Sequence, residues 1–200
     1  MIPQRAIDLI LESEGIDQPS RWPGGASGIT VGYGYDLGYE QNFARDWDGY
    51  LNADNIELLK QAVGVKGQAA RQIAHRFTDI RIPRTVALDV FTTKTLPRYE
   101  QQTLAAFPGA EKLPPLVFGA LVSLVFNRGG GMKDDPARPN DHTRLEMRQI
   151  RDAVAAGNLR EIARNFRTMK RLWVGKGLDG LLKRREAEAQ LVEEGAGAHA

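Results

Sequence analysis

Apolar positions recur at helical spacing along most of the chain, and one short β-rich segment interrupts this pattern near the beginning. Residues 3–14 predict a helix, because Ile7 and Leu11 lie on one apolar stripe and Gly15 stands where a helix commonly ends. Residues 29–35 alternate in character and are rich in β-forming side chains, which predicts a strand or hairpin. Six glycines fall within and beside this segment, so we expect tight turns and close backbone approach there.

From about residue 40 onward the apolar positions predict a helical body. A helix that is nearly all apolar stands in its middle, and its length indicates a central buried helix rather than a membrane span. Pro97 is expected to end the helix before it. A loop rich in Gly, Pro and Asp is expected over 128–140. The expected helices cover 52–63, 68–77, 84–96, 98–107, 115–127, 142–156, 158–172 and 179–194.

These elements predict an α+β fold in one domain over residues 1–200, a length that can bury a sizeable core. Within it we expect a first helix over 1–15, a β-containing lobe over 16–50, a helical body over 51–194 and a frayed tail over 195–200.

The composition excludes several classes of protein. With 42% hydrophobic and 26% charged residues, the chain as a whole is neither disordered nor fibrous. The absence of cysteine excludes disulfides and thiolate metal sites, and His75, His142 and His199 lie too far apart in sequence to suggest a metal site. We therefore expect no metal and no cofactor. Asp8 and Glu12 come too early for the apolar region of a signal peptide.

The net charge of +2 hides an uneven distribution. Residues 1–60 hold 4 Lys and Arg against 10 Asp and Glu, whereas residues 144–185 hold 12 against 4. A basic rear half suits a polyanionic partner such as a bacterial envelope or a nucleic acid. The same charges would equally be the solvated faces of amphipathic helices, and the pattern alone leaves both interpretations open.

Glu14 is the first candidate catalytic residue along the chain. It lies seven residues after Ile7 and three after Leu11, on the apolar face at the last helical turn. Burial and the negative end of the helix dipole both favour a protonated carboxyl group, the form that a general acid needs. An ion pair with an arginine of the helical body is the structural alternative. Glu12 lies on the polar face and is expected to be solvated.

The glycine-rich segment adds two candidates. Thr30 and Asp36 have the same parity as Gly32 and Gly34, so an unbroken strand would turn all four toward one side. A threonine hydroxyl can position a water molecule, and Asp36 can act as a second carboxylate. Two carboxyl groups flanking a sugar bond are the usual equipment for glycoside hydrolysis. The structural alternatives are β propensity for Thr30 and a turn position for Asp36.

Three segments together resemble the phage-type lysozymes, or muramidases. The first is Glu14-Gly15 closing a helix, followed by the strand Gly28-Ile-Thr-Val-Gly-Tyr-Gly34. The second is the apolar run that ends in Phe126-Asn-Arg-Gly129, which looks like the family's central helix and its Phe-Asn-x-Gly end. The third is Gly180-Leu-Leu-Lys-Arg-Arg-Glu, which is similar to the family's C-terminal helix. All three stand in the family's order and span most of the chain.

One departure from the usual family pattern concerns the second carboxylate. The family places an Asp nine residues after the Glu, and here Pro23 stands at that position. The order Glu14, Thr30, Asp36 instead resembles the muramidase domain of pesticin-like bacterial toxins. That resemblance implies Glu14 as general acid, Asp36 as second carboxylate and Thr30 as the residue that helps place water. Asp17, three residues after Glu14, is the backup for the second carboxylate.

The resemblance implies a lysozyme-like fold, with a small glycine-rich β lobe, a larger helical lobe and a cleft between them. It implies hydrolysis of the β-1,4 linkage between N-acetylmuramic acid and N-acetylglucosamine in peptidoglycan, without a cofactor. An inverting mechanism would need carboxyl groups about 6.5–9.5 Å apart, and a separation near 5 Å would favour a covalent intermediate. Tyr35 replaces a histidine that is frequent in phage enzymes. Candidate substrate-binding residues are Trp22, Tyr33, Tyr35, Asn127 and Trp173.

Two other functions compete with this one. Glu12-Ser13 resembles the Glu-Ser of lytic transglycosylases, which would make Glu12 the single catalytic acid, although no Gly-Leu-Met-Gln segment follows. A catalytically inactive module that binds the wall or another polyanion would use the basic helices from Arg144 to Arg185. Such a module would show no activity in the wild type or in Glu14→Gln.

We expect peptidoglycan as partner, with no nucleic acid and no membrane span, and a monomeric protein. The protein would be made in the cytoplasm without a signal peptide and would act on the wall in the periplasm after release or delivery. A phage endolysin, a virion component and an injected antibacterial effector all fit. An effector would have an immunity or inhibitor protein as a further partner.

Overall fold

The computed structural model describes residues 2–197, and these divide into two compact units. The helical unit contains the residues up to Ser13 and those from Arg98 onward, and the hairpin unit contains Glu14–Pro97. The division differs from the expected lobe boundary at residue 50, because the helices between residues 53 and 95 belong with the hairpin. Their buried side chains, such as Leu59 and Phe77, contribute to the core of that unit.

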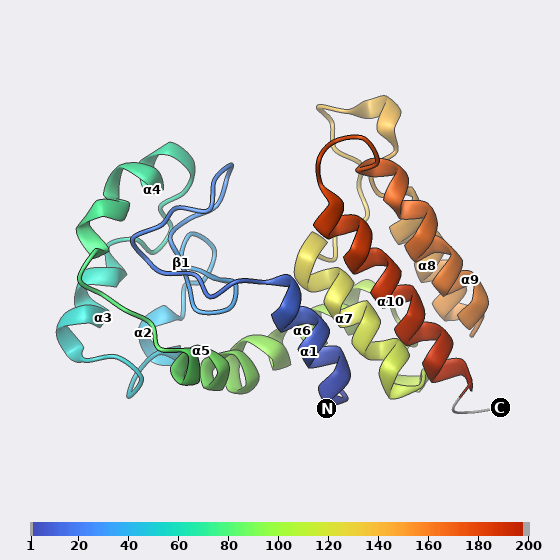
Figure 1. The fold of residues 1–200 in the computed structure, drawn as a ribbon, viewed down its shortest axis with the longest axis horizontal. Coiled ribbons are helices and arrows are strands. Elements are labelled where there is room, and N and C mark those ends of the chain that lie inside the picture. Colours follow the sequence, from blue (N-terminus) through green and yellow to red (C-terminus); the bar gives the residue numbers. More distant parts are fainter. Residues whose placement is uncertain (1, 198–200) are drawn as a thin grey trace. The chain divides into compact units, whose positions relative to one another are not determined.

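The helical unit is built around α7 (Pro115–Arg128), whose middle residues are buried, as the sequence predicted. Figure 1 shows α10 beside α7, with α9 next to α10. A Cβ atom on Gly119 would overlap the Cβ of Ala6, so the backbones of α1 and α7 approach closely. The remaining helices of this unit are α1 (Gln4–Ser13), α6 (Leu96–Ala106), α8 (Leu145–Ala155), α9 (Leu159–Thr168) and α10 (Asp179–Gly197), with short 3-10 turns at Ala110–Lys112, Pro139–Asp141 and Met169–Leu172.

A buried ionic network fastens α10 to α7. Arg185 and Glu188 are both fully buried, with Nε of the arginine 2.5 Å from Oε2 of the glutamate. Ser123 of α7 donates a hydrogen bond to Glu188 at 2.6 Å, and Arg184 donates to the hydroxyl and to the carbonyl of Ser123 at 3.2 and 3.1 Å. Arg184 and Arg185 lie in the segment that resembles the family's C-terminal helix, and this segment of α10 is therefore the part that binds to α7.

The hairpin unit contains the only sheet found between residues 2 and 197. Strands β1 (Thr30–Val31) and β2 (Tyr35–Asp36) pair antiparallel, which confirms the hairpin predicted over 29–35. Short helices complete the unit, namely α2 (Phe43–Asp46), α3 (Ala53–Lys60), α4 (Gly67–Ile73), α5 (Arg84–Val90) and the segments Ala74–Phe77 and Phe91–Thr95, which are 3-10 and π-helical.

Two predicted boundaries were wrong, and one short helix was missed. Pro97 does not end a helix, because it lies in the first turn of α6 directly after the π-helical segment, where its missing N–H is tolerated. α10 continues to Gly197, so residues 195–197 of the expected tail are helical, and the other tail residues, among them His199, lie outside the described part. The short helix α2 was missed, because four residues are too few for a helical period. Within residues 2–197, no helix combines the length and apolar character that a membrane span requires.

Candidate functional site

The hairpin brings Thr30 and Asp36 together. Their Cα atoms are partners in the antiparallel register, and residues opposite each other in such a pair share one face of the sheet. Thr30 is buried, with 5% of its surface exposed, and Asp36 is half-buried. The two residues share a face as expected, but through the register of a hairpin and not through their parity in one unbroken strand, because the chain turns between the two strands.

The other face of the hairpin is an aromatic core. Tyr35 is buried, and its ring packs edge-on to Phe43 and Trp47 with centroid separations of 6.3 and 5.7 Å. Its hydroxyl donates a hydrogen bond to the buried Asp46 at 2.9 Å. Tyr33 is also buried, edge-on to Phe91 at 6.0 Å. Both tyrosines, named from sequence as substrate contacts, are thus buried in the packing of the unit. Tyr35 is turned inward by strand alternation, and Tyr33 lies in the turn between the strands.

Backbone N–H groups hold the carboxylate of Asp36. Its Oδ1 accepts hydrogen bonds from Gly28 at 2.9 Å and from Gly38 at 2.8 Å, and its Oδ2 lies 3.1 Å from the same Gly28 nitrogen. Burial raises the pKa of Asp36, and the two backbone hydrogen bonds and the positive charge of Lys66 oppose that rise. Lys66 itself lies over the ring of Tyr39, 3.7 Å from its centroid. The carboxylate is therefore fixed in one orientation.

Gly28 and Gly38 cannot carry side chains at this crossing. A Cβ atom on Gly28 would lie 2.5 Å from Oδ1 of Asp36 and would overlap the backbone nitrogen of Gly38. A Cβ on Gly38 would lie 3.0 Å from the same Oδ1. Glycine at these two positions thus allows two backbone segments to approach the same carboxylate closely enough to donate hydrogen bonds to it.

Asp17 joins the hairpin as a third segment. It forms an antiparallel bridge with Gly32, with N–H to carbonyl distances of 2.7 and 3.0 Å in the two directions. Burial raises the pKa of Asp17 to about 6, and the negative charges of Glu14 and Asp36 add to the rise. A hydrogen bond from the backbone of Gly34 opposes it. The charges of two other carboxyl groups of the hairpin unit therefore act on Asp17.

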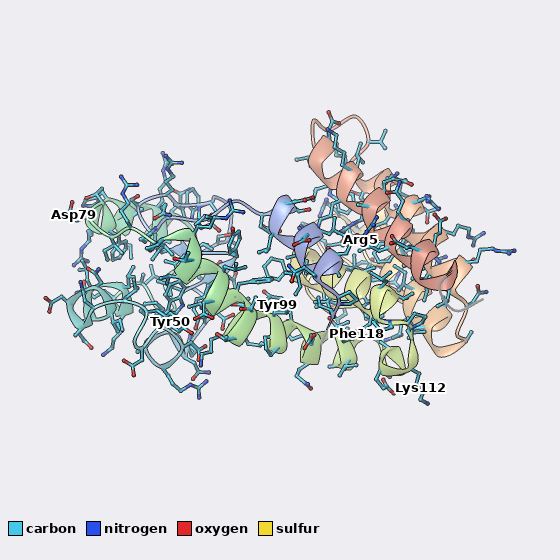
Figure 2. The ribbon with its side chains drawn as sticks, turned by 60° about the horizontal axis from the view of Figure 1, so that its bottom comes forward. Arg5, Tyr50, Asp79, Tyr99, Lys112 and Phe118 are labelled. Carbon is cyan, nitrogen blue, oxygen red and sulfur yellow. The ribbon has the colours of Figure 1, made fainter. Side chains whose placement is uncertain are left out.

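Glu14 and Glu12 differ in their surroundings. Glu14 is half-buried and directly follows the last residue of α1, one position beyond the helical turn expected for it. Glu12 is exposed, as predicted, and lines a shallow groove of the helical unit with Arg5, Asp8 and Gln190. Figure 2 labels Arg5 on α1, and its guanidinium pairs with Glu194 of α10 at 3.1 Å.

The remaining candidates lie in loops and at a helix end. Trp22 is half-buried, and its Nε1 donates to the carbonyl of Ser27 at 2.9 Å, which braces the loop that leads to Gly28. Asn127 is half-buried in the last turn of α7. Trp173 of the helical unit is half-buried, with the guanidinium carbon of Arg128 4.9 Å from its ring centroid. The sequence offered no reason to select Arg128, because it is one of many arginines in the basic half.

No group of three or more His, Asp or Glu side chains among residues 2–197 is arranged to hold a metal ion. The candidate residues offer acid and base chemistry, with carboxyl groups and a buried hydroxyl around one hairpin. No curated protein matches the sequence significantly. The family model for phage lysozyme matches residues 12–188, a range that includes Glu14, Asp17, Thr30 and Asp36. The chain belongs to the phage lysozyme family.

Proposed function

We propose that this protein is a muramidase, which hydrolyses the β-1,4 linkage between N-acetylmuramic acid and N-acetylglucosamine. Membership of the phage lysozyme family supports peptidoglycan hydrolysis as the activity. The observation that carries the finer assignment is the register of the hairpin, which pairs Thr30 with Asp36. A fixed carboxylate next to a hydroxyl is suited to orient one water molecule.

Glu14 is the general acid in this proposal. Its carboxyl proton passes to the glycosidic oxygen as the bond from that oxygen to the anomeric carbon breaks. Asp36 accepts a proton from the attacking water while the water oxygen bonds to the anomeric carbon, and Thr30 helps to hold the water. The reaction leaves Glu14 ionised and Asp36 protonated, and proton exchange with solvent restores both groups. This single displacement inverts the anomeric configuration.

Asp17 competes with Asp36 for the role of second carboxylate. A general base is most effective when its pKa lies near the working pH, and the pKa of about 6 favours Asp17 on that criterion. Asp36 accepts hydrogen bonds from two backbone groups, which fixes its orientation but also occupies lone pairs. The pairing with Thr30 favours Asp36, and we keep it as the first choice.

The test is mass spectrometry of the soluble products that the wild-type protein releases from purified peptidoglycan. Hydrated, reducing N-acetylmuramic acid ends are expected, and Glu14→Gln should lower their release about 100-fold or more. Glu12→Gln is the matched control on the same segment and should keep full activity, since Glu12 is exposed.

Other products would contradict the proposal. Anhydro ends that depend on Glu12 would identify a lytic transglycosylase instead. A well-folded wild-type protein that binds peptidoglycan but releases nothing would identify an inactive wall-binding module.

We propose that the enzyme serves as a phage endolysin or an antibacterial effector and reaches the wall in the periplasm by release or delivery.

A further inference from the structure

We propose that Tyr39 is a sugar-binding residue, whose exposed ring stacks against a pyranose ring of the glycan strand beside Asp36. This inference rests on the proposed function, because it takes the glycan strand of peptidoglycan as the ligand. Tyr39 lies at the end of the turn that directly follows β2 in the hairpin unit.

Tyr39 differs from the other tyrosines of the hairpin in its exposure. Tyr33 and Tyr35 are buried against other rings, whereas 56% of the surface of Tyr39 is accessible. It is the only aromatic residue among the exposed large hydrophobic side chains between residues 2 and 197. Single exposed apolar side chains are common on proteins, so the fixed orientation and the position of this ring are what distinguish it.

The ring of Tyr39 is held at its hydroxyl and on one face. The hydroxyl donates a hydrogen bond to the carbonyl of Ala26 at 3.1 Å, and Nζ of Lys66 lies over the ring, 3.7 Å from its centroid. Because the ammonium covers one face, the opposite face is the one open to a ligand. A ring that is already held in one orientation loses little conformational entropy when a ligand binds to it.

The backbone connects this ring closely to the carboxylate of Asp36. The N–H of Tyr39 donates to the carbonyl of Asp36 at 3.0 Å, and the N–H of Gly38 donates to its Oδ1 at 2.8 Å. Such a turn brings Cα atoms three residues apart within about 7 Å of each other. A sugar next to the one that reacts at Asp36 would therefore lie within reach of the ring.

The loop before β1 fixes the ring and the carboxylate together. The carbonyl of Ala26 accepts the hydroxyl of Tyr39, the carbonyl of Ser27 accepts Nε1 of Trp22 at 2.9 Å, and the N–H of Gly28 donates to Asp36. Three consecutive residues of the loop thus contact two aromatic side chains and the proposed second carboxylate. This arrangement holds Tyr39 in a constant position relative to Asp36.

The surroundings of the ring favour a sugar as its ligand. A pyranose presents a face of C–H groups with hydroxyl groups around it, which matches an aromatic face bordered by polar groups. The exposed ammonium of Lys66 and the carbonyl of Ala26 provide such a border. In the hairpin unit, Leu88 is the other large hydrophobic residue that is exposed, so the unit lacks the extended apolar patch that a protein partner or a lipid surface would need.

The experiment is calorimetric titration of peptide-free glycan strands, prepared from peptidoglycan with an amidase, into Glu14→Gln protein. Tyr39→Leu in this parent keeps apolar bulk without a ring and should weaken binding about 10-fold. Tyr39→Phe keeps the ring, loses the hydrogen bond to Ala26 and should weaken binding less than about 3-fold. The control is Leu88→Ala on α5, which removes apolar surface that is 39% exposed and should bind as the parent does.

Melting temperatures establish that each variant is folded. A loss confined to Tyr39→Leu would support the inference even if the wild type cleaved no glycan, in which case the muramidase proposal alone would fail. If Glu14→Gln still cleaves the strands, the same ranking is measured in KM. Equal affinities of folded Tyr39→Leu and Tyr39→Phe would overturn the inference, and so would a parent protein that does not bind the strands.

Discussion

Thr30 and Asp36 stand directly opposite each other in the hairpin, although six positions separate them in the chain. The turn between the strands uses Gly32 and Gly34, both with positive φ, at +63° and +66°. Gly32 also approaches Ala87 of α5, because a Cβ there would lie 3.3 Å from that side chain. A slip of one residue would turn the hydroxyl and the carboxylate to opposite faces, so the turn decides whether they meet.

The first prediction ranks the two candidate second carboxylates. Asp36→Asn should lower glycan cleavage about 100-fold or more, while its amide oxygen still accepts the hydrogen bonds of Gly28 and Gly38. Asp17→Asn should lower cleavage only mildly. Steady-state rates on purified peptidoglycan measure both, with the exposed Asp48→Asn as control in the same unit. The reverse ranking would transfer the role to Asp17.

The second prediction concerns Gly28. Gly28→Ala should destabilise the protein by about 1–3 kcal/mol, because the new methyl group meets the backbone of Gly38 and the carboxylate of Asp36. Activity should fall with it, since Asp36 must move. Gly15→Ala is the matched control, because nothing lies within 4 Å of a Cβ there, and it should change stability by less than about 0.5 kcal/mol. Equal melting temperatures for both variants would contradict the crossing.

The third prediction links Asp17 to the pH dependence of folding. Burial and the negative charge of Glu14 raise the pKa of Asp17 from 3.8 to about 6, so the folded protein binds this proton more tightly than the unfolded chain. The stabilising contribution is therefore complete below pH 3.8 and is lost as the pH rises through about 6. Asp17→Asn does not titrate and should lack this loss.

Urea denaturation at several pH values between about 3.5 and 7.5 measures the effect. As the pH rises across this range, the wild type should lose about 1–3 kcal/mol of unfolding free energy relative to Asp17→Asn. Parallel curves for the two proteins would show that the carboxyl group titrates alike in both states. The exposed Asp48→Asn serves as the comparison, because it leaves Asp17 and its neighbouring carboxyl groups in place.

The fourth prediction concerns the buried network of the helical unit. Glu188→Ala should cost about 3–5 kcal/mol of folding free energy, because it leaves the fully buried Arg185 without its anion. Glu194→Ala, on the same helix, removes an exposed pair with Arg5 and should cost about 1 kcal/mol or less. Thermal or urea denaturation compares the two. Similar losses would mean that burial adds nothing to the pair.

The identity of most elements could be predicted from periodicity. The stripe of α1, the apolar run of α7 and the alternation around Thr30 each repeat over enough residues to indicate one element. The extent of the elements was less accessible. Pro97 reads locally as a helix end, and only the π-helical turn before it explains why α6 includes it.

The sequence by itself was enough to predict the hairpin, the order of the main helices along the chain and the resemblance to phage lysozymes, because these depend on local spacing and short motifs. The tertiary structure alone decided which charged groups meet. The charge of Asp36 acts on Asp17 because a β-bridge to Gly32 places Asp17 beside the hairpin that carries Asp36. Arg128 contacts Trp173, which lies far from it along the chain. Electrostatic energies depend on separation and burial in space, and neither quantity can be read from positions along a chain.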